Sequence, residues 1–470
     1  MDSYPYYTAY VATVIIAVLL VCRRIRPQVY LSLPPGPRPW PIIGNLLDFP
    51  SAAPWTTFDR LGKTYGDVIH MRVMGHSVVV LMSIFLCDLV EAGWAMVLQG
   101  YTDSWRRSRR VFRQYFNRDV APKFQEIQRE ETQAFLLRLH RSPDEVQGLN
   151  DPYVAIAEEV MKGFSEAGQP GRFYVDFIPF LRYIPTWFPG ALFHKRAASL
   201  KPVFNAMVNK PFNVVKDSIV SGSTIPSVVL SMLEGIHDGT RREEDEMAVK
   251  SSAASAYAGG ADTTRSAIQL FLLAMVLYPD VQRRAQAELQ SIVGSNRMPA
   301  FADRPSLPYV QALILEILRW QPVAPLSMPH STSSSDTYRG YYIPKGAIVI
   351  GNAWSILHDP QHYPNPFSFN PERFLKNGRL DSDVLSPTVV CFGFGRRICP
   401  GQFFALDSLY IIVSSILQLF DISHKIDECG QQIAVDVRLT SGLISSTEPF
   451  ACSFKLRSAA AEALFSSLPD

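Results

Sequence analysis

A ten-residue segment near the C-terminus constrains the fold more than any other part of the chain. It reads Phe-Gly-Phe-Gly-Arg-Arg-Ile-Cys-Pro-Gly over 392–401 and precedes an apolar stretch that predicts a helix from Gln402 to about Leu419. Its glycines allow backbone conformations that a Cβ atom forbids and let the backbone approach a flat partner closely. Cys399 would lie at the N-terminus of that helix, where the helix dipole stabilises a thiolate. Arg397 adds a positive charge two residues earlier.

A single thiolate held in this way suits an axial ligand of haem iron, because cysteine ligation donates electron density to the metal. Taken alone, the segment could also be a glycine turn that carries a buried cysteine. It resembles the haem-binding loop of the cytochrome P-450 family, whose pattern is Phe-x-x-Gly-x-Arg-x-Cys-x-Gly, and it meets every fixed position from Phe392 to Gly401. The resemblance implies haem b as the cofactor, Cys399 as the iron ligand, Phe392 and Arg397 as cofactor-binding residues, and a mainly α-helical fold with a minor β region.

Cysteine content and charge argue against several other classes of site. The chain has six cysteines and no Cys-x-x-Cys pair, which argues against zinc ribbons and iron–sulfur clusters. Sparse, scattered cysteines in a chain of 470 residues suit a reducing compartment. The formal net charge of +2 favours no highly charged partner such as nucleic acid.

The first 26 residues predict a membrane anchor. Tyr6 to Cys22 is almost wholly apolar, is followed by three arginines, and is long enough to span a bilayer. Positive charge on its C-terminal side predicts that the rest of the chain faces the cytosol. The alternative is a cleaved signal peptide, which would carry charge before the apolar run and a small-residue cleavage site after it. The prolines of residues 27–41 predict a stiff, non-helical hinge before a domain over 42–470.

The longest helical pattern in the chain runs from Glu243 to Leu277. It is apolar on nearly all sides, which predicts a buried helix. Two adjacent glycines at 259–260 cost its interior about 2 kcal/mol relative to alanine. Either another group packs against this bare backbone, or the helix opens there. Asp262 and Thr263 place an acid and an alcohol beside that point.

Two interpretations of this acid–alcohol pair are open from the residues alone. One is a glycine-kinked core helix whose threonine bonds its own backbone. The other follows from a resemblance to the oxygen-binding groove of the cytochrome P-450 family, in which a glycine precedes an acid by two residues and a threonine follows the acid. The resemblance assigns Thr263 to hydrogen bonding of dioxygen at the iron and Asp262 to proton relay.

The propionates of haem need cations or hydrogen-bond donors. Trp105 and Arg109 match the family's Trp-x-x-x-Arg pair on one helical face, and His330 and Arg397 stand where the family supplies further propionate partners. For His330 the alternative is an ordinary loop histidine.

Two groups of charged residues are expected to support this site. Glu316 and Arg319 lie on one helical face, and with Arg373 they resemble the family's structural triad, which holds the cysteine loop. Arginines also crowd the expected propionate helix and haem loop, where a solvated basic face is the alternative to docking of an acidic electron donor. The implied donor is the membrane-bound NADPH-cytochrome P-450 reductase. These arginines are Arg106, Arg107, Arg110, Arg113 and Arg396.

Two regions of the chain are shorter than the family leads us to expect. One lies between Met82 and Trp105, near 82–105, and the other lies near 142–151. On the order of 20 residues are missing at each place, judged by the helices that the fold requires. The chain is therefore either a trimmed enzyme or the product of an imperfect gene model.

The resemblance implies a monooxygenase of the microsomal fungal type, similar to O-methylsterigmatocystin oxidoreductase. Such an enzyme sits in the endoplasmic reticulum membrane as a single-pass protein and inserts one oxygen atom of O₂ into a lipophilic small molecule. A terpenoid, polyketide or indole-derived substrate of secondary metabolism fits an apolar pocket and membrane anchoring. Two alternatives are a haem-thiolate isomerase or dehydratase and a truncated, inactive membrane protein.

Overall fold

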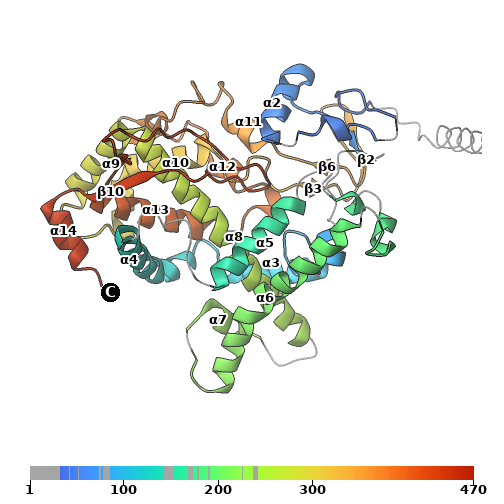
Figure 1. The fold of residues 1–470 in the computed structure, drawn as a ribbon, viewed down its shortest axis with the longest axis horizontal. Coiled ribbons are helices and arrows are strands. Elements are labelled where there is room, and N and C mark those ends of the chain that lie inside the picture. The colour runs from blue at the N-terminus through green and yellow to red at the C-terminus, as the bar shows by residue number, and fades with distance from the viewer. Residues whose placement is uncertain are drawn as a thin grey trace, which may run out of the picture.

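A computed structural model of the chain describes residues 32–469, except for 42, 51, 74–75, 78–84, 142–151, 168–172, 177–178, 189–190, 225 and 237–241. Within these residues the chain is mainly α-helical and every sheet is two-stranded, which confirms the predicted helical fold with a minor β region. Figure 1 places a group of helices at one end of the molecule and short strands at the other. The helices are α4 (Gln125–Arg141), α9 (Pro279–Ile292), α10 (Pro308–Trp320) and α13 (Gln402–Leu419), and the strands are β2 (His76–Ser77), β3 (His330–Ser331) and β6 (Ile348–Val349).

The longest helix, α8 (Arg242–Leu277), begins one residue before the predicted start and ends where the sequence predicts. Its second half is buried on almost every side, and Phe271 and Met275 are fully enclosed. This half forms the main hydrophobic core together with α10 and α13, and the bounds of α13 agree with the sequence. The glycine pair does not interrupt α8, so the helix stays closed at Gly259 and Gly260.

Among the described residues, α13 is the one helix long and apolar enough to cross a membrane. It contacts α4, α8, α9 and α10 and contributes to the main core, so it is a core helix of the folded body. The predicted anchor, Tyr6 to Cys22, lies outside the described residues.

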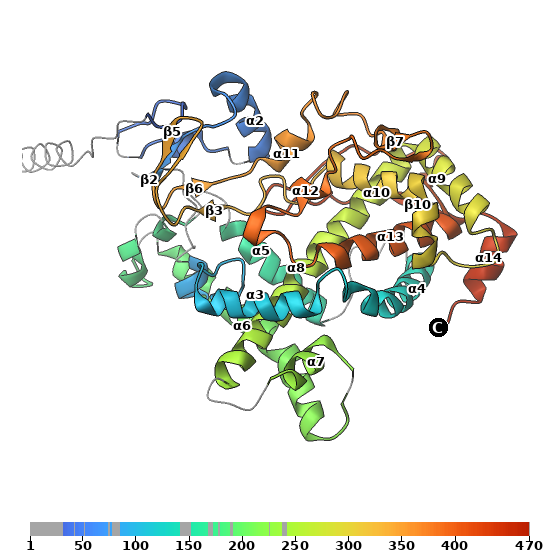
Figure 2. The same cartoon turned by 180° about the vertical axis from the view of Figure 1, so that it is seen from behind.

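A second group of helices covers the first half of α8. It comprises α3 (Asp103–Tyr115), α5 (Pro152–Ala167), α6 (Leu192–Val220) and α7 (Val228–Glu234), and Figure 2 shows α3 lying across α8 with α6 and α7 below. Helix α6 continues through Pro202 and Pro211. Helices α5 and α6 approach closely at Gly163, where a Cβ atom would lie 3.0 Å from the ring of Phe204.

The sequence over 105–140, dense in Arg and then in Gln and Glu, predicts a helix, but the structure breaks it in the middle. Helix α3 ends at Tyr115, and η3 (Ala121–Phe124) leads into α4. The side-chain oxygen of Asn117 accepts hydrogen bonds from the backbone N–H groups of Asp119 and Val120 at 2.8 and 3.1 Å. Such local bonds compete with the helical pattern, which explains the break.

The strands pair in short antiparallel ladders. Strand β1 (Arg72–Val73) pairs with β2. Between β4 (Asp336–Tyr338) and β5 (Tyr341–Ile343), Arg339 and Gly340 both have left-handed backbones, which suits a tight hairpin turn. Strands β3 and β6 also pair. The remaining ladders are β7 (Leu375–Lys376) with β8 (Arg379–Leu380) and β9 (Phe420–His424) with β10 (Cys452–Leu456).

The described part of the proline-rich hinge, residues 32–41, is non-helical as predicted, but it is fastened to the body. The backbone N–H of His70 donates to the carbonyl of Pro35 at 2.9 Å, and that of Tyr342 donates to the carbonyl of Ser32 at 3.0 Å. A Cβ atom on Gly36 would lie 1.9 Å from the His70 carbonyl oxygen, so only glycine fits there.

In the first short region, the described residues hold one π-helical turn, η2 (Phe85–Leu89), before α3 begins. The second short region, 142–151, lies outside the described residues, between α4, which ends at Arg141, and α5, which begins at Pro152. The other helices are α2 (Pro54–Tyr65), α11 (Ala353–Leu357), α12 (Thr388–Cys391), α14 (Ala459–Ser466), η1 (Leu46–Asp48), η5 (Tyr174–Asp176), η6 (Pro179–Tyr183), η7 (Phe301–Ser306), η8 (Pro371–Phe374) and η9 (Gly395–Arg397).

Candidate active site

The cysteine loop joins α12 to α13 and closes on itself. The backbone N–H of Cys399 donates to the carbonyl of Phe392 at 2.7 Å, which ties the two ends of the loop together. Gly393 and Gly395 have φ values of 77° and 56°, in the left-handed region that favours glycine. Cys399 therefore lies just before α13, at the place that the sequence predicts.

The thiol of Cys399 is buried, and its surroundings act on its pKa in opposite directions. Burial raises the pKa, while the backbone N–H of Gly401 and the positive charge of Arg109 lower it. Arg109 reaches the loop from α3 and donates to the carbonyl of Ile398 at 2.5 Å. The cation that acts on this thiol is thus Arg109, whereas the sequence suggested Arg397.

The second cysteine of this region, Cys391, has a different environment. Burial, followed by the charge of Cys399, raises the pKa of Cys391 to about 12. It packs against the main core and has no cation among the groups that lower its pKa. Cys391 is therefore held as a neutral thiol.

The residues predicted to hold propionates come together beside this loop. The guanidinium carbon of Arg397 lies 4.0 Å from the ring centre of Trp105, and its N–H groups donate to the carbonyls of Met96 and Gln99 at 3.4 and 3.0 Å. His330 enters from β3, where burial first and then the charge of Arg397 lower its pKa. One helix, one strand and one loop thus deliver these side chains to a single place.

Arg109 and Arg397 provide a test of whether haem fits this place. Both guanidiniums are partly buried, and this burial lowers the pKa of each. Among the described residues, neither guanidinium has a carboxylate within ion-pairing distance. Two partly buried cations without a counter-ion are costly unless a negative group joins them. The two propionates of haem b have the required charge, and the buried thiol supplies the metal donor, so these residues fit the cofactor.

On α8, Gly259 and Gly260 are exposed, and a Cβ atom added to either would meet nothing within 4 Å. The hydroxyl of Thr263 donates to the carbonyl of Gly259 at 2.5 Å. This is the bond to its own helix backbone that a threonine in a glycine-kinked core helix would make. The helix nevertheless presents bare backbone to open space on this turn. No contact given by the structure joins Thr263 or Asp262 directly to Cys399 among the described residues.

Asp262 is largely enclosed and belongs to a cluster of charges. Burial first, and then the negative charge of Glu158 on α5, raise the pKa of Asp262, while the positive charge of Arg265 lowers it. Arg265 Nη2 lies 3.4 Å from Asp262 Oδ1, and Arg265 also forms an ion pair with Glu158. Sequence reasoning missed this cluster. Arg265 stands one helical turn after Asp262 and was a visible signal, but nothing in the local sequence points to Glu158.

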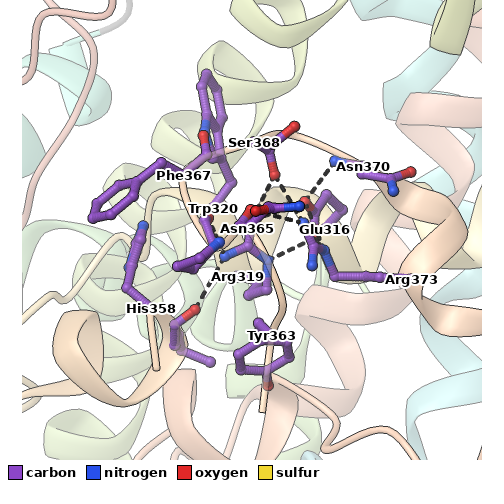
Figure 3. A network of polar contacts seen from close by, with 12 residues as sticks. Glu316, Arg319, Trp320, His358, Tyr363, Asn365, Phe367, Ser368, Asn370 and Arg373 are labelled. Carbon is purple, nitrogen blue, oxygen red and sulfur yellow. Dashed lines mark hydrogen bonds and ion pairs between the residues drawn. The ribbon is translucent and has the colours of Figure 1, made fainter. Parts of the chain in front are cut away.

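The predicted triad forms a buried network between α10, which carries Glu316 and Arg319, and η8, which carries Arg373 (Figure 3). Glu316 receives hydrogen bonds from Arg319 at 2.7 and 2.8 Å and from Arg373 at 3.2 Å. Glu316 and Arg319 are fully buried. Arg319 also donates to the carbonyls of Leu357 and Pro366 at 3.0 and 2.7 Å. The network thus fastens the 357–370 segment directly, and it reaches the cysteine loop only through neighbouring elements.

His358 lies at the edge of this network and stacks on Trp354 with ring centres 4.1 Å apart. Its Nδ1 donates to the carbonyl of Trp354 at 2.8 Å, and its buried Nε2 has no hydrogen-bond partner among the described residues. Burial, and then the charge of Arg319, lower the pKa of His358 to about 4, although Asp59 and the carbonyls of Trp354 and Trp320 raise it. The imidazole is therefore neutral at physiological pH.

We expect this histidine to make the fold sensitive to acid. The folded pKa of about 4 lies below the unfolded value of 6.5, so the unfolded state binds the proton more tightly. The titration of His358 leaves the free energy of unfolding unchanged above pH 6.5 and lowers it as the pH drops further. The loss reaches about 3 kcal/mol near pH 4. Unfolding midpoints measured from pH 7.5 to 4.5 should fall less steeply in His358→Asn than in the unchanged protein. Parallel curves for the two proteins would contradict the prediction.

Comparisons with known proteins agree with this site. The family model for cytochrome P-450 matches residues 34–90 and 149–441. A cytochrome P-450 monooxygenase, number 98, of Postia placenta is 39% identical over 98% of this chain and 97% of its own length. Tryptamine 4-monooxygenase of Psilocybe cyanescens is 34% identical over 92% of this chain and 94% of its own length.

These comparisons also bear on the short regions. The alignment with the Postia placenta protein runs over 505 positions, although this chain has only 470 residues, so the relative holds internal residues that this chain lacks. The match to the family model leaves out residues 91–148, which include α3 and lie across most of both short regions. The family uses haem b with a cysteine thiolate ligand and takes O₂, an organic substrate and electrons from a redox partner. The chain belongs to the cytochrome P-450 family of haem-thiolate monooxygenases.

Proposed function

We propose that Cys399 is the haem ligand of this enzyme and that Trp105, Arg109, His330 and Arg397 hold the propionates, with Phe392 at the base of the loop. One observation carries the proposal: Arg109 acts on the free thiol of Cys399, Arg397 lies over Trp105 beside the same loop, and neither partly buried guanidinium has a carboxylate partner among the described residues. Haem b, when bound, supplies the activation of O₂. The protein then has to place the substrate, exclude water and deliver protons.

We further propose that Asp262 and Thr263 deliver these protons on the turn of α8 that follows Gly259 and Gly260. The enclosed carboxyl of Asp262 has a raised pKa, which suits a group that must hold and release a proton. The hydroxyl of Thr263 can pass a proton on when it turns away from the carbonyl of Gly259. The bare backbone at the glycine pair leaves room for a small molecule beside both groups.

Removing the hydroxyl of Thr263 should uncouple the enzyme. We expect Thr263→Ala to consume NADPH while the product formed per NADPH falls by at least about tenfold and hydrogen peroxide appears in its place, because the last proton is no longer delivered. Product and peroxide measured against NADPH test this expectation. Thr263→Ser keeps a hydroxyl and should keep most of the coupling. Unchanged coupling in Thr263→Ala would remove this residue from the proposed mechanism.

The substrate is proposed to be a lipophilic terpenoid, polyketide or indole-derived molecule of secondary metabolism. The tryptamine 4-monooxygenase among the relatives supports an indole as the first class to test. Incubation of the enzyme with members of each class, NADPH and reductase should give a product heavier by one oxygen atom. An isomerase or dehydratase would instead convert its substrate without NADPH, and an inactive chain would show no haem spectrum.

NADPH-cytochrome P-450 reductase is the proposed electron donor. Arg110, Arg113 and Arg396 are exposed and support docking of an acidic surface. The other two arginines of the predicted group are engaged within the chain: Arg107 pairs with Glu244 and Asp245, and Arg106 pairs with Asp103. Replacement of the three exposed arginines by glutamine should slow reduction by the reductase at low ionic strength, and an unchanged rate would contradict this docking surface.

The N-terminal residues are proposed to anchor the enzyme in the endoplasmic reticulum membrane, with the catalytic domain over 42–470 in the cytosol and residues 27–41 as the connection. The apolar run from Tyr6 to Cys22 and the arginines after it support this topology. Carbonate-resistant pelleting of the chain without residues 1–26 would contradict the anchor.

A further inference from the structure

The charge cluster around Asp262 links the proposed proton relay to a neighbouring helix. Arg265 stands between two carboxylates, Asp262 on its own helix α8 and Glu158 on α5. The contact with Asp262 is long, at 3.4 Å, whereas the ion pair with Glu158 is close. Arg265 Nε is buried and has no hydrogen-bond partner among the described residues, so the guanidinium is incompletely satisfied. Arg265 therefore pairs more closely with Glu158 than with Asp262.

We propose that Glu158 is a positioning residue that draws Arg265 away from Asp262 and thereby keeps the Asp262 carboxyl free to carry a proton. This inference rests on the proposed role of Asp262. A carboxylate clamped by a guanidinium is a poor proton donor, because the ion pair stabilises its charged form. While Glu158 pairs with Arg265, the contact between Arg265 and Asp262 stays long. Because Glu158 lies on α5, the position of α5 sets the length of that contact.

The other two glutamates of α5 form their ion pairs with a different arginine, so the contact with Arg265 is particular to Glu158. Glu159 and Glu166 both pair with Arg196 of α6, at 3.3 and 2.7 Å. Adjacent glutamates on α5 thus point to different helices, Glu158 to α8 and Glu159 to α6. The charged groups that act on the pKa of Asp262 are Arg265 and Glu158.

Loss of Glu158 should change Asp262 through two effects of the same sign. The negative charge of Glu158 raises the pKa of Asp262, so its removal lowers that pKa. Arg265, left partly buried without its closer partner, then turns to Asp262 and lowers the pKa further. Asp262 stays ionised to lower pH, and proton transfer from it slows.

The experiment compares Glu158→Gln with its matched control, Glu159→Gln, in the haem-loaded enzyme. Infrared difference spectra between acid and neutral pH report protonation of Asp262, with Asp262→Asn to identify its band. The titration midpoint of this band should move to lower pH in Glu158→Gln and stay in place in Glu159→Gln. With reductase and NADPH but no added substrate, the rate of O₂ consumption should fall by roughly threefold to tenfold in Glu158→Gln, a small part of what a positioned acid contributes. The solvent isotope effect on this rate of O₂ consumption should rise in Glu158→Gln.

A double variant distinguishes closer pairing of Arg265 with Asp262 from a general disturbance of the structure of α5. Glu158→Gln with Arg265→Gln removes both the competitor and the cation, so the midpoint and the rate should return toward those of the unchanged enzyme. If the double variant is as slow as Glu158→Gln, or if Glu158→Gln and Glu159→Gln behave alike, the proposal is overturned. If Asp262→Asn leaves the rate and isotope effect unchanged, the proposed role of Asp262 fails instead, and the band midpoints still report whether Glu158 controls the pairing.

Discussion

Cys399→Ser is expected to abolish both turnover and the strongly red-shifted Soret band that a thiolate-ligated haem gives with CO after reduction. A serine hydroxyl cannot supply the electron density of a thiolate to the iron. The loop itself should survive the change, because the bond between the Cys399 N–H and the Phe392 carbonyl uses only backbone atoms. The spectrum and NADPH-dependent turnover of the purified variant measure the effect, and a retained red-shifted band would contradict the assignment.

Cys391→Ser is the matched control for this prediction. Cys391 lies eight residues earlier in the same region and is also a buried free thiol. Its pKa of about 12 keeps it neutral, it packs against the main core, and no cation is among the groups that lower that pKa. We expect the band and the turnover to persist in this variant. Equal loss in both variants would show that Cys399 is not the sole ligand.

Much of this fold could be predicted from local sequence signals. The bounds of α13 and the end of α8 agree with the sequence because each is set by proline, glycine or a long apolar run. The left-handed glycines of the cysteine loop follow from the same kind of signal. The break at Asn117 was missed because a side chain there bonds its own backbone in competition with a helical pattern.

What the sequence did not predict depends on contacts between distant segments. Arg107 looked like part of a free basic face, yet Glu244 and Asp245 of α8 neutralise it. Arg397 looked like the cation beside the thiol, yet it lies over Trp105 while Arg109 takes that place. The pairing of Arg265 with Glu158 also joins two helices. No local pattern encodes such pairings, so charged residues can be identified from sequence more readily than their partners.

Glu316→Gln should be the most destabilising charge substitution in the described body of the protein. It leaves two guanidiniums, Arg319 and Arg373, facing one another in a buried place without a negative charge between them. Breaking a buried ion pair by removing one partner costs about 3–5 kcal/mol, a large part of a typical total of about 5–15 kcal/mol. Urea or thermal unfolding of the haem-loaded protein measures the loss. Glu372→Gln is the control, because its ion pair with Arg284 is half-exposed and worth about 0–1 kcal/mol.

The loss in Glu316→Gln should come mainly from the unpaired cations, and this can be tested by removing one of them. Arg319 retains its bonds to the carbonyls of Leu357 and Pro366, so it can stay in place. Arg373 is less buried and also donates to the carbonyls of Pro364 and Ser368, at 2.7 and 2.9 Å, so both guanidiniums stay in place when Glu316 loses its charge. Glu316→Gln combined with Arg373→Met should therefore be less destabilised than the sum of the two single variants. Strictly additive losses, or a loss below about 1 kcal/mol in Glu316→Gln alone, would show that the carboxylate does not neutralise the two guanidiniums.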